Sequence, residues 1–482
     1  MRLPFILRGI VALALTAAST MVSAQQTADA AQIAVEAARK YSGQTLNMTW
    51  PGGVGALDPK LHTVPLFEKL TGVKVNVIEA PPPEMFPKIM VEHRAKTGAY
   101  DVVSMIPSWL ADLASAGAIE PLDGFVKKYK FGAELALIEP AYRDSQMKWD
   151  GKIFGIPDDG DVLILYYRKD LFGDPANRSA FKAKYGYELA PPTTWQQFSE
   201  IGNFFTDKYA PKLYGAGMIR RASLLHYFFQ ERFRNEGGRF FDPVSMKSTV
   251  NSDIGVKVLA GMVADQKFMP PGSQDWGVPE SLNGWLSGNL AMTLWWPPVG
   301  RWSEGLQAGE KAMAFVPRSQ IAGKVGYALP PGGRPELALG WSLAVASSSK
   351  KKELAYLFIQ FANSEQVSID RVQLPYSLRD PFRSSHFSSP QYRALWPTAG
   401  EYLDLLKSAA QTALPDLSIR NTFQYEESLT RALQRASSGV SPKVCLDDLA
   451  KEWDAITQRT GVDKQREAYK IWASSPNAYP KK

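Results

Sequence analysis

Hydrophobic and polar residues alternate in a regular order between residues 44 and 105. The run TLNMTW, within 44–51, has the character of a strand, and 73–78 alternates as a second strand. Between them, 65–71 places Phe67 and Leu70 on one side of a helix that ends at Gly72. A helix from about 84 to 96 and a buried, Val-rich strand over 100–105 follow. This order predicts a parallel sheet joined by right-handed crossovers.

A turn-rich acidic segment, Trp149 to Asp170, interrupts this pattern with the sequence WDGKIFGIPDDGDVLILYYRKD. Asp150-Gly151 favours a tight turn, Pro157 stops a short extended run, and 162–167 resumes as an apolar strand. We interpret the whole segment as a hinge strand between two lobes, with a cleft beside it. Taken singly, its aspartates are better explained as ordinary turn acids at a surface.

Helical and strand patterns alternate through the rest of the chain. Thr194 is a predicted N-cap, because Trp195 and Phe198 begin one helical face after it. Ser349 is likewise expected to cap a helix, and 374–379 is a second candidate crossing between lobes. Residues 25–40 are expected to be a leader or a loosely docked helix, and 171–189 is a basic, aromatic insertion whose structure the sequence leaves open. Further strands are expected at 213–218, 290–296, 325–329 and 340–346, and further helices at 222–235, 252–265, 280–287, 402–414, 424–436 and 446–457.

Length and composition predict two lobes. The chain has 482 residues, of which 45% are apolar, and single hydrophobic cores rarely grow past about 250 to 300 residues. Aromatic residues make up 11% and include 13 Trp, which is enough to line a cleft as well as to fill cores.

The first 24 residues have the features of a cleaved signal peptide. Arg2 and Arg8 give a basic start, 9–18 is a short run of apolar and small residues, and Val22-Ser23-Ala24 fits the signal peptidase pattern. We expect cleavage after Ala24 and an exported, periplasmic chain without stable membrane insertion, because no later run is long and apolar enough to span a bilayer. An uncleaved anchor helix is the less favoured alternative.

The content of cysteine, histidine and charge excludes several classes of protein. Cys445 stands alone, so no intramolecular disulfide and no cysteine-ligated zinc can form. The four histidines lack any metal-binding spacing. A net charge of +7 is spread along the chain without a cluster, so nucleic acid is not an expected partner. We therefore expect no metal and no cofactor.

Candidate ligand-binding residues follow from positions at the ends of predicted strands. Ligands of open parallel sheets bind beyond the carboxyl ends of the strands. This rule singles out Trp50, Ser104, Ser108 and Trp109. Either tryptophan could instead fill a core, and for Trp109, which starts an apolar helix, a core position is at least as well supported.

Two further groups of side chains could contact a ligand. Trp295 and Trp296 end a predicted strand, where side chains alternate, so one of them is expected to face a cleft and to stack on a sugar ring. Trp276, in a preceding loop, is another aromatic candidate. Arg220 and Arg221 could bind an anionic or polyhydroxyl ligand, although solvated charges are the more frequent explanation.

Four stretches stand in a fixed order along the chain: WDGKIFGIPDDGDVLILYYRKDLF, PPTTWQQF, LSGNLAMTLWW and LGWSLAVASSSKKKELAYLFIQFANSEQ. Each is similar to a pattern of the extracellular solute-binding proteins of ABC importers, in the large sugar-binding family that includes maltose-binding protein. One such stretch alone is a weak signal, whereas four in the right order over some two hundred residues are specific. The resemblance covers nearly the whole mature chain.

The resemblance implies an α/β fold of the type II periplasmic binding protein class, in which two lobes, each a mainly parallel sheet flanked by helices, close on a ligand at the hinge. The N-lobe would comprise 44–157 and 329–373, and the C-lobe 158–328 and 374–482, after a leader at 25–43. Asp161 is the carboxylate best assigned to the ligand, with Asp158 and Asp159 as hinge and turn acids. The family's ligand positions fall on Trp50, Gly52, Ser104, Ser108, Asp161, Trp295, Trp296, Trp341, and Phe423 or Tyr425. Several match by position and not by residue type; Ser108, for example, stands where maltose-binding protein has an acid.

These observations favour a non-catalytic protein that captures a sugar, oligosaccharide or polyol and delivers it to the permease and ATPase subunits of an ABC importer. A variant of this hypothesis has an anionic solute, such as a sugar acid or phosphate ester, held by Arg220, Arg221 or Arg379. A secreted glycoside hydrolase is the alternative from another class, because aromatics and paired carboxylates also line such active sites. We expect a monomer, and a signalling role through a chemoreceptor stays open.

Overall fold

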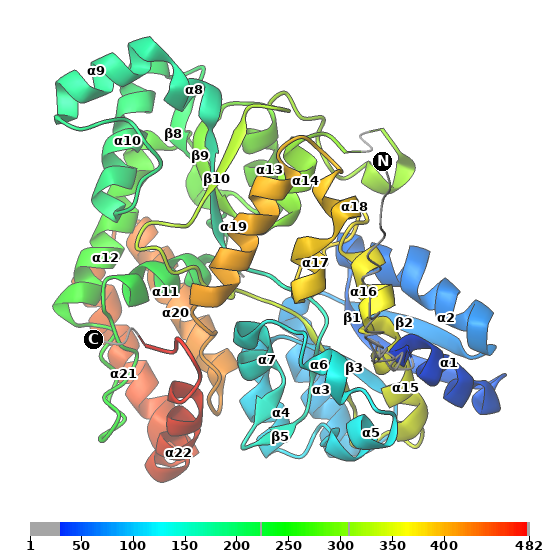
Figure 1. The fold of residues 1–482 in the computed structure, drawn as a ribbon. Helices are drawn as coiled ribbons and strands as arrows, with labels where there is room; N and C mark the ends of the chain where they lie inside the picture. Colours follow the sequence, from blue (N-terminus) through cyan, green and yellow to red (C-terminus); the bar gives the residue numbers. More distant parts are fainter. Residues whose placement is uncertain (1–28, 222–223, 307–308, 480–482) are drawn as a thin grey trace, which may run out of the picture.

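Two β-sheets, each covered by helices, form the framework of the molecule (Figure 1). This computed structural model describes residues 29–221, 224–306 and 309–479, so the predicted signal peptide lies outside the described residues. Three segments of chain supply the helices. The first contributes α1 (Ala30–Ala38), α2 (Val64–Thr71), α3 (Pro82–Ala95), α4 (Leu110–Ser115), α5 (Asp123–Lys128), α6 (Gly132–Leu135) and α7 (Pro140–Gln146). The second contributes α8 (Lys169–Gly173), α9 (Pro175–Tyr185), α10 (Trp195–Tyr209), α11 (Leu225–Asn235), α12 (Asp253–Ala264), α13 (Val278–Leu286) and α14 (Pro298–Ser303). The third contributes α15 (Lys352–Ala362), α16 (Glu365–Arg371), α17 (Ser384–Ser388), α18 (Pro390–Arg393), α19 (Ala399–Thr412), α20 (Thr422–Ser437), α21 (Pro442–Thr460) and α22 (Val462–Ala473).

The first sheet has five strands in the order β2-β1-β3-β11-β6. Its strands are β1 (Thr45–Pro51), β2 (Lys74–Ala80), β3 (Val102–Met105), β6 (Ile156–Pro157) and β11 (Ser342–Val345). Strand β1 lies between β2 and β3 and runs parallel to both, which confirms the predicted parallel core. Strand β11 enters from far along the chain and is antiparallel to β3 and β6.

The second sheet has four strands in the order β10-β7-β9-β8. They are β7 (Ile164–Arg168), β8 (Tyr214–Ala216), β9 (Leu290–Trp295) and β10 (Val325–Ala328). Here β10–β7 and β7–β9 are antiparallel, and β8–β9 is parallel. The α/β class is confirmed, but the expected mainly parallel sheet is wrong for this half. Strand β9 is buried along its whole length, so its sequence is mostly apolar. This pattern does not tell whether the neighbouring strands are parallel or antiparallel to it.

Helices α1 and α15 differ from the predictions made for them. Helix α1, expected to be a leader or a loosely docked helix, packs on α15, and its small residues Ala31, Ala34 and Ala38 are buried (Figure 1). Alanines give a weak apolar signal but allow two helices to approach closely. Ser349 does not cap α15: its hydroxyl donates to Asp101 Oδ1 (2.6 Å), and the helix begins three residues later. Thr194, by contrast, is confirmed as an N-cap within a capping box.

The chain passes between the sheets three times. It leaves the first sheet after β6 and enters the second at β7, returns between β10 and β11, and leaves again after α16. The hairpin of β4 (Lys148–Trp149) and β5 (Lys152–Ile153) precedes the first crossing and turns at Asp150-Gly151, as predicted. The lobe boundaries proposed from sequence, 44–157 with 329–373 and 158–328 with 374–482, stay a prediction.

The first and last crossings touch at Gly160. The backbone N–H of Gly160 donates to the carbonyl of Asp380 (3.1 Å), and the carbonyl of Gly160 accepts a hydrogen bond from the hydroxyl of Tyr142 (2.9 Å). A side chain at this position would overlap the carbonyl group of Pro381. The close approach of the two backbones therefore requires glycine, independently of any backbone strain.

We predict that Gly160→Ala separates the two crossings and destabilises the protein. Overpacking against a backbone carbonyl that cannot move aside costs about 1–3 kcal/mol or more. Urea unfolding should show a lower midpoint with an unchanged slope. Gly124→Ala is the matched control, because a side chain there meets no atom within 4 Å in helix α5 and removes backbone freedom from the unfolded chain. Equal stability of Gly160→Ala and the wild type would contradict the packing at the crossings.

Candidate ligand-binding cleft

A cavity of about 810 Å³ lies where the crossings meet the ends of strands from both sheets. Its walls come from the segments after β1, β3 and β9, from the starts of α3, α11 and α13, and from one face of α20. The lining residues are Pro51, Gly52, Val54, Gly55, Pro82, Pro83, Ile106, Trp109, Asp161, Leu224, His226, Tyr227, Val278, Pro279, Leu282, Trp295, Trp296, Pro298, Trp302, Phe315, Leu339, Trp341, Leu378, Arg379, Phe423, Glu426, Glu427, Thr430, Arg431 and Gln434. The cavity is thus built jointly by the two sheets and their connections.

Tethered tryptophans form much of the apolar wall. The indole N–H of Trp295 donates to Ser281 Oγ (3.1 Å), that of Trp296 to the carbonyl of Ala338 (2.8 Å), and that of Trp302 to the carbonyl of Pro375 (2.9 Å). Each bond fixes the plane of a ring that also lines the cavity. Flat aromatic faces held in this way suit the C–H surface of a sugar or polyol.

Both Trp295 and Trp296 line the cavity, whereas the sequence predicted that one of them would. The alternation rule does not apply to the second, because β9 ends at Trp295 and the chain turns at Pro297 into α14. Their ring centroids lie 6.0 Å apart with the planes at 80°. The two rings therefore present different surfaces to the same space.

Some of the predicted ligand residues lie on this cavity and others do not. Gly52, Asp161, Trp295, Trp296, Trp341 and Arg379 line it, as do Trp109 and Phe423, for each of which the sequence left an alternative open. Trp50, Ser104, Ser108, Arg221, Trp276 and Tyr425 are absent from its lining. Trp50 is a supporting residue: its indole N–H donates to the carbonyl of Gly55 (2.8 Å), and its ring lies 4.6 Å from the guanidinium of Arg379. Ser104 is buried in β3, and Ser108 reaches the cavity only through Glu426.

One face of helix α20 lines the cavity, and its spacing is visible in the sequence. Its cavity-lining residues are Phe423, Glu426, Glu427, Thr430, Arg431 and Gln434, a spacing that repeats every three or four residues. Tyr425 is on the opposite face, where its hydroxyl meets Thr457 and Gln465 in the core. Of the two alternatives that the resemblance left open, Phe423 lies on the cavity and Tyr425 does not. The mostly polar stripe at helical spacing is the sequence signal for the rest of this wall.

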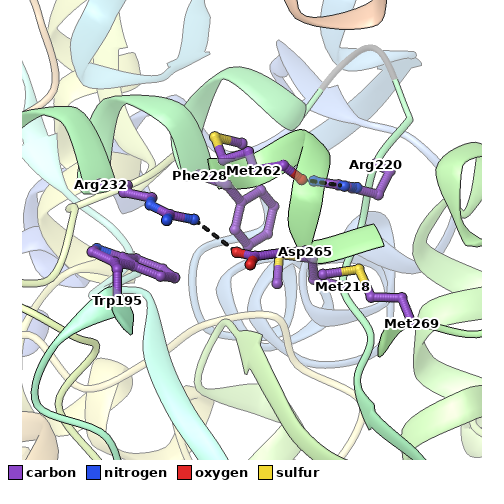
Figure 2. A pocket seen from close by; sticks show the side chains of 8 residues that line it. All are labelled: Trp195, Met218, Arg220, Phe228, Arg232, Met262, Asp265 and Met269. Carbon is purple, nitrogen blue, oxygen red and sulfur yellow. Dashed lines mark hydrogen bonds and ion pairs between the residues drawn. The ribbon is translucent and has the colours of Figure 1, made fainter. Parts of the chain in front are cut away.

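The two adjacent arginines do not reach the cleft. Arg220 lines a separate cavity of about 10 Å³, shown in Figure 2, and donates from Nη2 to the carbonyl of Met262 (2.9 Å). In the same cavity Arg232 pairs with Asp265 (2.8 Å) and lies over the ring of Trp195. The side chain of Arg221 is exposed. An anionic ligand in the cleft therefore cannot be held by either Arg220 or Arg221 in this arrangement.

A buried network of ions holds the crossings together. Arg371 pairs with Asp58 and with Asp158, each at 2.6 Å, and Arg379 pairs with Asp158 at 2.7 Å and with Asp159 at 3.3 Å. All of these side chains are at most 2% exposed. Asp158 and Asp159 were predicted to be hinge and turn acids. The alternative that they are ordinary turn acids at a surface is wrong, because both are buried and pair with arginines more than two hundred residues away along the chain.

Three carboxyls of this region lie side by side at the edge of the cleft. Asp159, Asp161 and Asp380 offer oxygens within 4.8 Å of one another. Burial and the neighbouring carboxylates raise the pKa of Asp161 well above its usual value, and burial raises the pKa of Asp159 to about 8 and that of Asp380 to about 6. Near neutral pH the cluster thus retains protons. Asp161 presents a carboxyl group to the cavity and accepts a hydrogen bond from the Gly340 N–H (3.3 Å).

The chain crosses three times between two lobes, each built on a sheet, and a cleft with aromatic walls lies where the crossings meet. This arrangement defines a two-lobed binding protein. Residues 50–368 match the family described as bacterial extracellular solute-binding protein. The chain belongs to this family, as its four sequence stretches predicted.

Individual relatives are distant in sequence. A probable amino-acid ABC transporter periplasmic-binding protein from Sinorhizobium fredii is 25% identical over 339 residues, or 68% of this chain and 71% of that protein. A mannitol-binding protein from Pseudomonas aeruginosa is 24% identical over 288 residues, or 56% of this chain and 57% of that protein. Among solved structures, an ABC transporter solute-binding protein from Agrobacterium radiobacter in complex with ribitol superposes with a TM-score of 0.70 at 21% identity, covering 86% of this chain and 99% of that one. That likeness confirms the fold.

The buried carboxyls predict that the protein loses stability as the pH rises. The pKa values of Asp159 and Glu426 are raised to about 8 and that of Asp380 to about 6, whereas unfolded carboxyls titrate near pH 4. Between about pH 4 and pH 8 the folded state therefore holds more protons than the unfolded state, so stability falls across this window. Calorimetry should give a higher Tm at about pH 5.5 than at about pH 8.

Substitution by neutral amides provides the control for this prediction. Asp161→Asn and Glu426→Gln remove a titrating group while keeping its shape, so each should flatten the dependence of Tm on pH. Glu452→Gln, at an exposed glutamate on α21, should leave the slope as in the wild type. A Tm that climbs steadily from about pH 5.5 to about pH 8 would show that these carboxyls are ionised in the folded protein.

Proposed function

We propose that this protein is the solute-binding component of an ABC importer, which captures a neutral sugar, oligosaccharide or polyol and delivers it to a membrane permease. The observation that carries this proposal is the cavity itself: flat, tethered aromatic faces combined with carboxyl groups that burial keeps protonated. Such a wall matches a ligand with both C–H and O–H surfaces. The mannitol-binding relative and the ribitol complex of similar fold support a polyhydroxyl ligand.

Charge in the cavity favours a neutral solute over the anionic alternative. Arg379 is paired with Asp158 at 2.7 Å and with Asp159 at 3.3 Å. Arg431, at the rim, pairs with Glu452 at 2.6 Å. Among the lining residues that the structure describes, these two are the arginines, and both already have acidic partners. A sugar acid or phosphate ester would have to compete with those partners for each guanidinium.

Transport requires closure rather than chemistry. The lining residues belong to both sheets and to the crossings, so a bound solute contacts both lobes at once. A ligand that binds the closed arrangement better than the open one shifts the protein toward closure by that difference in affinity. The permease would then recognise the closed form, with the ATPase subunit supplying the energy for import.

The same carboxyls argue against a glycoside hydrolase. Such enzymes need two free carboxyl groups on opposite sides of the scissile bond. Asp158 and Asp159 are engaged by Arg371 and Arg379, and Asp161 lies next to Asp159 in the same crossing. We propose that the protein has no enzymatic activity, in keeping with its family.

Export and partners complete the proposal. We propose that residues 1–24 are a cleaved signal peptide, that the mature chain works in the periplasm as a monomer, and that its partners are the permease and ATPase subunits. Within the described residues, no helix has the length and hydrophobicity needed to cross a bilayer.

We expect neutral polyhydroxyl solutes to raise the melting temperature. D-mannitol, ribitol and maltose would be compared with gluconate, glucose 6-phosphate and a set of amino acids by thermal shift, and hits confirmed by calorimetric titration. A ligand at 100 times its Kd adds about 2.7 kcal/mol of stability. Stabilisation by sugar acids alone would favour the anionic variant, and stabilisation by amino acids alone would favour the activity named for the Sinorhizobium relative. Turnover of any glycoside that is lost in Asp161→Asn would establish an enzyme instead.

Truncation of a wall tryptophan should weaken binding selectively. Trp341→Ala removes a ring that lines the cavity and meets Trp109 edge to face at 6.2 Å, and loss of its stacking should raise Kd on the order of 10-fold. Trp276→Ala, at a tryptophan outside the lining, is the matched control and should leave Kd unchanged. Isothermal titration with the solute that gives the largest thermal shift measures both. Equal losses in the two variants would mean that the cavity walls are assigned wrongly.

A further inference from the structure

Four residues of the cleft carry polar atoms that have no partner. Within the described residues, Trp109 Nε1, His226 Nε2, Arg379 Nη2 and Glu426 Oε1 are buried and make no hydrogen bond, and all four side chains line the cavity. The other indoles behave differently, since those of Trp295, Trp296 and Trp302 are satisfied within the protein. A buried polar group without a partner costs free energy, so these groups weaken the unliganded fold.

We propose that Trp109, His226, Arg379 and Glu426 together form the hydroxyl-binding set of this cleft, with Glu426 as its specificity-determining residue. The inference rests on the proposed function and deepens it, because it names the side chains that form hydrogen bonds with the hydroxyl groups of the solute. From the sequence, Arg379 is a candidate for an anionic ligand and Trp109 fits either a core or a cleft, whereas His226 and Glu426 are not among the candidate residues.

Glu426 is placed for this role by two elements. It extends from α20, which packs against α11 and against the 3₁₀ turn Pro107–Trp109. The hydroxyl of Ser108 in that turn approaches one carboxyl oxygen, Oε2, at 3.5 Å. The other oxygen, Oε1, has no protein partner. The carboxyl is thus held from one side while its second oxygen is left for the solute.

The surroundings of Glu426 keep it neutral. Burial raises the pKa of Glu426 to about 8, and the acids Asp112 and Glu336, from other segments of the chain, act in the same direction; Asp416 also interacts with Glu426. A neutral carboxyl group can donate a hydrogen bond as well as accept one. Glu426 therefore matches a hydroxyl group in either direction.

His226, at the start of α11, and Trp109, in the 3₁₀ turn after β3, supply matching groups to the cavity. The Nδ1 of His226 faces the hydroxyl of Thr430 at 3.4 Å, and burial lowers the pKa of His226 to about 3, so its ring is neutral. Its Nε2 can donate or accept, according to the direction of the Thr430 bond. Trp109 Nε1 can only donate. Together these groups demand a ligand whose groups both donate and accept, which is the property of a hydroxyl.

The test compares affinity with stability in the absence of solute. D-mannitol, ribitol and maltose are titrated calorimetrically into the wild type, Glu426→Leu, Glu426→Gln and Trp109→Phe. We expect Glu426→Leu to weaken binding by about 10-fold or more, Trp109→Phe by roughly 3- to 10-fold, and Glu426→Gln by less than about 3-fold, because the amide both donates and accepts. Without solute, Glu426→Leu should melt at the same temperature as the wild type or higher, since it removes an unpaired buried polar group.

The possible outcomes distinguish a failure of this inference from a failure of the proposed function. If none of the three solutes binds the wild type, the proposed function and this inference fail together. If the wild type binds and both Glu426→Leu and Trp109→Phe keep their affinity within about twofold, the hydroxyl-binding set is wrong while the proposed function stands. Should Glu426→Leu fail to fold, Trp109→Phe decides alone. Glu467→Gln is the control and should bind as the wild type does, because its exposed side chain lies on α22 outside the cavity.

Discussion

The pairing of Arg371 with Asp58 and Asp158 is the interaction on which the rest of the structure depends. It joins the segment after the first strand, the first crossing and the end of α16, which lie far apart in the chain. Charges this deeply buried are tolerated only as a complete set, because removal of one partner leaves the other without solvent or counterion. The network therefore fixes where the crossings meet, and with it the floor of the cleft.

The same network explains the chemistry of the cleft. Three guanidiniums, those of Arg301, Arg371 and Arg379, face five carboxyls, those of Asp58, Asp158, Asp159, Asp161 and Asp380. Burial raises the pKa values of Asp159 and Asp380, so the surplus of acid is accommodated by protons. Asp161, at the edge of this set, therefore lines the cavity as a hydrogen-bonding carboxyl group more than as a negative charge. A structural ion network thereby favours uncharged ligands.

Local patterns in the sequence predicted the strands of the first sheet, the acidic crossing and the family, because each is encoded within a few consecutive residues. What depends on distant partners could not be predicted in this way. The burial of Asp158 is set by Arg371 and Arg379, and the inward face of α20 is set by the turn that holds Ser108. The placement of Tyr425 in the core illustrates the limit, because the choice between two faces of one helix depends on what packs against each.

The tethered indoles of Trp295, Trp296 and Trp302 have a consequence for the thermodynamics of recognition. Their rotamers are already restricted by hydrogen bonds made during folding, so a solute does not have to immobilise them. The entropic penalty that flexible side chains impose on association is thus largely absent from this wall. A small solute has few atoms with which to make contacts. Because these side chains are already ordered, little of its binding free energy is lost in ordering them.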